Sequence, residues 1–67
     1  MGQEISSINS ILAIVALRES GDSVQGGAPI ILVDTREDLE EISMLLARIT
    51  LGMVHELTDN IKIIIKH

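Results

Sequence analysis

The residues with the greatest chemical capacity lie late in the chain, where His55 and Glu56 precede Asp59. Helices of zinc proteases carry two histidines four positions apart on one face, with a glutamate beside them as the general base. In this chain Asp59 occupies the position of the second histidine. With two histidines and no cysteine, one copy of the chain also lacks the ligands of a closed zinc site. We therefore predict a solvent-facing His55 and expect no catalytic residue, no metal and no cofactor.

A glycine-rich connection over residues 19–28 contains Gly26 and Gly27. Phosphate-binding loops lead from a strand into a helix N-terminus, whereas this connection leads into Pro29 and a predicted strand. Acidic residues within it would also repel an anion. The glycines are therefore expected to serve a surface turn, and a lid over a ligand site is the alternative.

The corner formed by Asp34, Thr35 and Arg36 follows that strand. Open α/β sheets often bind ligands at the carboxyl ends of their strands, but Asp34 or Thr35 also has the side chain that caps a helix. Capping explains the corner without a ligand, so it is the favoured interpretation. The alternative is a small-ligand site, and its residues would be Asp34, Thr35, Arg36, Gly26 and Gly27.

An amphipathic helix is predicted from Arg36 to Leu57, and it is the clearest element of the sequence. Acidic residues in its first turns meet the positive end of the helix dipole, and Asn60 tolerates the left-handed conformation that ends helices. The helix would be about 33 Å long. It would exceed the strands in length, so one end should overhang the sheet. The apolar stripe that faces the sheet consists of Leu39, Ile42, Leu46, Ile49, Met53 and Leu57.

Short runs of β-branched residues on both sides of this helix, residues 29–33 and 61–66, predict strands. A strand–helix–strand unit makes its two strands parallel. Isoleucines at alternate positions of the second strand should share one face. Lys62 and Lys66 on the other face indicate solvent contact or a sheet edge.

The segment before the glycine-rich connection fits more than one structure. Residues 11–18 suit either a strand buried on both faces or part of a helix. Their β-branched side chains and the need of a sheet for more than two strands favour the strand, after a loose or briefly helical segment 1–10. The sequence thus predicts one α+β domain over residues 1–67. It would be a single-layer sheet with one long amphipathic helix in the order β-β-α-β, and the alternative order is α-β-α-β.

Composition excludes several classes of function. The 67 residues carry a net charge of -5 and contain no aromatic residue, which argues against phosphate binding and base stacking and hence against nucleic acid. The apolar runs are too short to span a bilayer, and we expect a cytoplasmic protein with no membrane partner. A domain this small buries little surface. Without disulfides or metals, oligomerisation is the expected source of further burial.

Apolar residues also interrupt the polar face of the predicted helix. Met44 and Leu51 lie there seven positions apart, and Ala47 and Val54 widen the apolar surface beside them. Several exposed apolar residues in register indicate a second buried contact. The leading hypothesis is a non-catalytic interaction or accessory module that acts as a homo-oligomer or as a small subunit of an assembly with a protein partner. The alternatives are a small-ligand-binding regulatory domain that uses residues 19–28 and 34–36, and an enzyme completed around His55 by a second subunit.

Overall fold

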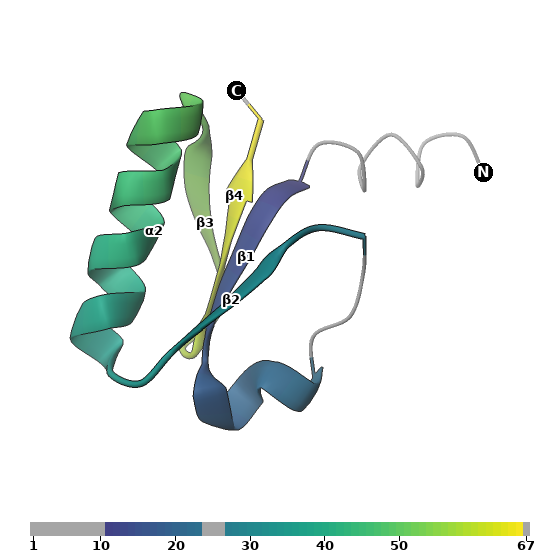
Figure 1. The fold of residues 1–67 in the computed structure, drawn as a ribbon, viewed down its shortest axis with the longest axis vertical. Coiled ribbons are helices and arrows are strands. Elements are labelled where there is room, and N and C mark those ends of the chain that lie inside the picture. The colour runs from purple at the N-terminus through teal and green to yellow at the C-terminus, as the bar shows by residue number, and fades with distance from the viewer. Residues whose placement is uncertain (1–10, 24–26, 67) are drawn as a thin grey trace.

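A computed structural model of the chain describes residues 11–23 and 27–66, and Figure 1 shows an α-helix against one face of a sheet. The elements in chain order are β1 (Ile11–Leu17), the 3-10 helix η1 (Arg18–Ser23), β2 (Ile30–Val33), α2 (Arg36–Thr50), β3 (Met53–Thr58) and β4 (Ile61–Ile65). The predicted α+β class and the order β-β-α-β are confirmed, including the strand that begins at Ile11. One further strand, β3, follows the helix. The structure predicted for residues 1–10 lies outside the described residues.

The sheet has four strands in the order β2-β1-β4-β3. β1 pairs with β2 in parallel, and β4 is antiparallel to both of its neighbours. β2 and β4 therefore run in opposite directions, and the prediction that residues 29–33 and 61–66 form parallel strands is wrong. The crossover helix instead joins β2 to β3. These two strands run the same way, but they lie at opposite edges of the sheet.

The helix ends at Thr50, and the prediction that it continues to Leu57 is wrong. The Thr50 hydroxyl donates a hydrogen bond to the Leu46 carbonyl at 2.7 Å, and the Gly52 N–H donates to the Ala47 carbonyl at 2.9 Å. Leu51 between them is in the left-handed conformation, with φ 60° and ψ 32°. A Cβ on Gly52 would lie 2.8 Å from the Ile65 carbonyl oxygen. The close approach of the chain to β4 thus requires glycine at this position.

Residues 53–58 form the edge strand β3, whereas the helical spacing predicts a helix through Leu57. Met53 lies opposite Ile65 and Thr58 opposite Ile61, with a bulge between Glu56 and Thr58. The fifteen residues of α2 give a helix about 22 Å long, and the seven residues of β1 give a strand of about 23 Å. The expected overhang of the helix is therefore wrong, because helix and sheet match in length.

Both faces of the sheet are apolar. Because successive side chains of a strand point to opposite faces, β1 contributes to both. The core between the sheet and α2 contains Val15, Leu17, Val33 and Leu39, with Ile31, Ile42 and Leu46 packed against it. The opposite face carries a second cluster of Ile14, Ala16 and Ile61, with Ile11, Ala28 and Ile63 at its border.

The 3-10 helix η1 covers one end of this second face. A Cβ on Gly21 would lie 2.8 Å from Leu32 Cδ2, and Leu32 pairs with Ala16 of β1. The backbone of η1 therefore packs directly on the Leu32 side chain, and a larger residue at position 21 would displace the end of that side chain.

Lys62 departs from the prediction that it marks solvent contact or a sheet edge. It lies on the inner strand β4, and its side chain is only 8% exposed. Its Nζ is 3.2 Å from Glu40 Oε2 on α2 and 3.1 Å from Glu56 Oε1 on β3. The hydrogen bond to Glu56 raises the pKa of Lys62 above its ordinary value, burial opposes this rise, and Glu40 adds to it. The amine therefore remains charged and links the helix to the edge strand.

Candidate protein interface

The corner at Asp34, Thr35 and Arg36 is built from groups that bond within the fold. The Thr35 hydroxyl accepts a hydrogen bond from the Asp38 N–H at 3.0 Å, so Thr35 is the N-cap of α2 and the capping interpretation is confirmed. Arg18 Nε donates to Asp34 Oδ1 at 2.8 Å. The N-terminal end of the helix is thereby connected to the end of β1.

Arg36 holds the turn between β3 and β4. Its Nη1 donates to the Asp59 carbonyl at 2.8 Å, and its Nη2 donates to Asn60 Oδ1 at 3.2 Å. Asn60 also donates through Nδ2 to Ser20 Oγ at 3.2 Å, and its carbonyl accepts from the Leu17 N–H at 2.9 Å. The prediction that Asn60 ends the helix is wrong, because α2 ends at Thr50. Asn60 instead joins the hairpin turn to η1, β1 and the start of α2.

Of the two glycines in the predicted ligand site, the structure describes Gly27 alone. Gly26 is outside the described residues. Gly27 precedes β2 and Asp34 follows it, so the whole of β2, four residues or roughly 13 Å long, lies between them, and a Cβ placed on Gly27 meets no heavy atom within 4 Å. The corner is therefore a structural junction, and ligand binding by these two sets of residues stays a prediction.

Three residues of the predicted interface belong to α2 or its C-cap, and the fourth belongs to β3. Met44 and Leu51 are 58% and 79% exposed, and Ala47 is partly buried between them. Val54 belongs to β3, so the helical spacing that grouped it with the others does not apply. It pairs with Ile64 on the helix-facing side of the sheet, and so still lies on the side of the edge strand that faces α2.

Further apolar side chains, outside the predicted interface, are exposed on α2. Ile49 is 67% exposed and Leu45 48% exposed, although the helical stripe placed Ile49 in the core. The centre of the buried helix face is instead occupied by Leu39 and Ser43, both fully buried. The continuous apolar run Leu45-Leu46-Ala47 is the signal that both flanks of the helix are apolar. We call the exposed set formed by Met44, Leu45, Ile49 and Leu51 the α2 apolar surface.

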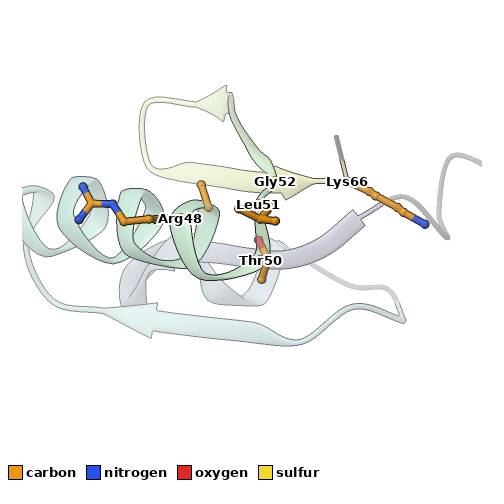
Figure 2. Close-up of a pocket in the computed structure, with 6 residues that line it drawn as sticks. Arg48, Thr50, Leu51, Gly52 and Lys66 are labelled. Atoms are coloured by element: carbon orange, nitrogen blue, oxygen red, sulfur yellow. The ribbon is translucent and has the colours of Figure 1, made fainter.

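An open, shallow depression lies where α2 ends, and Figure 2 shows its lining. In this view Leu51 lies between Arg48 and Lys66, whose long side chains extend to opposite sides. The lining residues are Ala47, Arg48, Thr50, Leu51, Gly52 and Lys66. A second shallow depression on the outer side of the helix is lined by Glu41, Met44, Leu45 and Arg48, so the two share Arg48.

The described ranges, 11–23 and 27–66, contain no group of three or more His, Asp or Glu side chains that could hold a metal ion. His55 is exposed on β3, opposite Ile63. No helix within the same ranges is long and apolar enough to cross a membrane.

The chain belongs to the protein family described as "Capping complex subunit for YIEGIA", whose model matches residues 8–67. No curated protein matches the chain, and no solved structure matches it. The family is named for a subunit of a complex, which confirms the prediction of a small subunit of an assembly with a protein partner.

Proposed function

We propose that this chain is a non-catalytic subunit of a complex with a YIEGIA protein and binds its partner through the α2 apolar surface. The observation that carries the proposal is the exposure of Ile49 and Leu51, at 67% and 79%, at the C-terminal end of α2, beyond the helical residues that the core buries. Family membership supplies the partner, because the family is described as a capping complex subunit for YIEGIA.

The energetics of burial support this use of the helix. Covering one exposed Leu, Ile or Met side chain contributes on the order of 1.5–3 kcal/mol, and isolated domains rarely leave such residues clustered. The chain has no aromatic residue, so aliphatic side chains must serve as the interface anchors that aromatic residues usually supply. The helix is also a rigid support, since Leu39 and Ser43 fix its other face against the sheet.

The test is binding to the full-length YIEGIA protein from the same organism, measured as a dissociation constant with the purified proteins. Ile49→Glu and Met44→Glu are each expected to weaken binding at least about tenfold, because each places a charge in the desolvated contact. Leu57→Glu is the matched control, since Leu57 is also exposed but lies on β3. Failure of the wild-type chain to bind, or equal loss in the control, would contradict the proposal. Circular dichroism checks that each variant is folded.

Self-association is a second proposal, and the edges of the sheet favour it. β2 and β3 are the outer strands, and within the described residues their outer edges pair with no other strand. Ile30 on β2 is 39% exposed and Met53 on β3 is 47% exposed. A second copy that pairs along one of these edges would cover them. Analytical ultracentrifugation should then give a mass that rises above 7.3 kDa with concentration and falls in Ile30→Lys or Met53→Lys. A constant monomer mass would contradict it.

A further inference from the structure

We infer that the depression around Leu51 is the specificity site of this subunit and accepts an apolar side chain of the partner that is flanked by carboxylates. The inference rests on the proposed function, because it assigns the chemistry of the partner segment that the subunit recognises. The site consists of Leu51, Arg48 and Lys66, with Ala47, Thr50 and Gly52 completing its lining.

The conformation of Leu51 gives the first reason. Leu51 adopts φ 60° and ψ 32°, a region in which a Cβ crowds the following carbonyl and which helix ends usually fill with Gly or Asn. Its side chain is 79% exposed, so packing within the described fold does not offset that strain. A leucine at this position helps neither the helix end nor solubility. A contact with another molecule explains its presence.

The distribution of charge gives the second reason. The chain carries a net charge of -5, and cations elsewhere bond within the fold. Arg18 pairs with Asp34, and Lys62 pairs with Glu40 and Glu56. Among the Lys and Arg residues that the structure describes, Arg48 and Lys66 alone have neither an ion pair nor a hydrogen bond, because Arg36 bonds to Asp59 and Asn60. Both line the depression.

The position of these two cations sets the chemistry of the occupant. Figure 2 shows that their side chains extend on either side of Leu51, so carboxylates on both sides of a central apolar residue would meet them. The carbonyl groups at this helix end are already engaged, because Leu46 accepts from Thr50 and Ala47 accepts from Gly52. The negative end of the helix dipole is therefore partly neutralised before a partner carboxylate approaches.

The opposite end of α2 restricts the orientation of an acidic segment. Its first turns carry Glu37 and Asp38, followed by Glu40 and Glu41. Like charges facing each other across an interface are unfavourable and exclude wrong registers. An acidic partner segment on α2 is therefore directed to the Arg48 end.

The experiment measures the affinity of full-length YIEGIA protein for four forms of this chain. Leu51→Gly removes the apolar anchor and relieves the strained backbone, so we expect binding to weaken at least about tenfold while the melting temperature rises. The double variant Arg48→Gln/Lys66→Gln should lower the association rate about tenfold and flatten its dependence on salt. The control is Arg18→Gln, because Arg18 is exposed in its pair with Asp34, which adjoins the N-cap of α2 at the opposite end of the helix. This variant should leave affinity unchanged.

The outcomes separate this inference from the proposed function. If the wild-type chain binds and the Leu51 and Arg48/Lys66 variants bind equally well, the specificity site is wrong and the proposed function stands. If the wild-type chain does not bind, both fail together. If these variants change only the mass of this chain in ultracentrifugation and not its affinity for YIEGIA, the occupant is a second copy and the inference is overturned. If Leu51→Gly raises the melting temperature, the variant is folded, and its loss of binding is not caused by misfolding.

Discussion

The two ends of α2 use similar residue types in opposite ways. At the N-terminal end, Thr35 caps the helix, Asp34 pairs with Arg18, and Arg36 holds the turn at Asn60. At the C-terminal end, Arg48 and Lys66 have no bonded partner within the described residues, and Leu51 is exposed in a strained conformation. At the N-terminal end, which we call the closed end, the polar side chains bond within the fold. At the C-terminal end, which we call the open end, Arg48, Lys66 and Leu51 remain available to a partner.

This difference shows that residue type alone does not locate an interface. The Asp34 to Arg36 corner has the composition of a ligand site, yet each of its side chains satisfies a group inside the molecule. Arg48 and Lys66 are ordinary surface cations by composition. They become candidates for contact with a partner because no acidic or polar group of the described residues bonds to them. The predictions below test whether the closed parts depend on their internal partners and whether the open end is dispensable for folding.

The largest effect is expected where a buried cation loses its partners. In Glu40→Ala/Glu56→Ala, Lys62 would remain buried without a counter-charge, and the free energy of unfolding should fall by about 3 kcal/mol at pH 7. Each single variant leaves one carboxylate in place, and both carboxylates are more than half exposed, so each should cost less than about 1 kcal/mol. Urea denaturation measures all three.

The pH dependence of the free energy of unfolding tests whether the charge of Lys62 causes this loss of stability. The pKa of Lys62 is raised from 10.5 in the folded wild type, so its contribution to stability is complete below that value and is lost as the pH rises through the folded pKa. In the double variant, burial without partners lowers the pKa, and stability should increase as the pH rises. The difference between the two proteins should therefore narrow between pH 7 and about pH 10. A constant difference would contradict the assignment.

The second effect tests the closed end of the helix. Asn60→Ala removes the acceptor for Arg36 and the donor to Ser20, and the loss of two hydrogen bonds should lower the free energy of unfolding by about 2 kcal/mol. At the open end, Arg48→Ala and Lys66→Ala should each change it by less than about 0.5 kcal/mol. Equal effects at the two ends would remove the distinction between them. The measurement is again a urea transition.

The third effect lies midway along the helix, at Ser43. This side chain is fully buried, and its hydroxyl has no hydrogen-bond partner among the described residues. Ser43→Ala should therefore stabilise the protein by about 1.5 kcal/mol, because it removes an unsatisfied polar group and improves helix propensity. A loss of stability in thermal or urea unfolding would mean that the hydroxyl is bonded in solution. Ser43→Val is the matched enlargement and should destabilise by overpacking.

The smallest effect has the opposite sign from most substitutions. Leu51→Gly should raise the free energy of unfolding by about 1 kcal/mol, because glycine takes the left-handed conformation without a Cβ penalty. Differential scanning calorimetry measures the change. Leu51→Ala is the control, since it shortens the side chain and keeps the Cβ, and it should not stabilise. If Leu51→Gly lowers the free energy of unfolding, the Leu51 side chain stabilises the fold and is not reserved for a partner.

The sequence determined much of the fold. Runs of β-branched residues located β1, β2 and β4, and the Thr35 cap together with acidic first turns located the start of α2. These signals are local, because a capping side chain or an alternating run acts on neighbouring backbone. The exposure of Met44 and Leu51 also follows from the sequence. The predicted helical spacing holds from Arg36 to the end of α2, where Leu51 is the C-cap.

Tertiary structure decided where the helix stops and what each polar residue does. The apolar spacing from Leu39 to Leu57 continues through Gly52, and such spacing over six residues fits a helix and a strand equally well. Pairing with β4 and the close approach at Gly52 made residues 53–58 a strand. Likewise, nothing local shows that Lys62 meets two carboxylates while Arg48 meets none. Long-range contacts alone make that difference, because they decide which charges are satisfied inside the molecule and which remain for a partner.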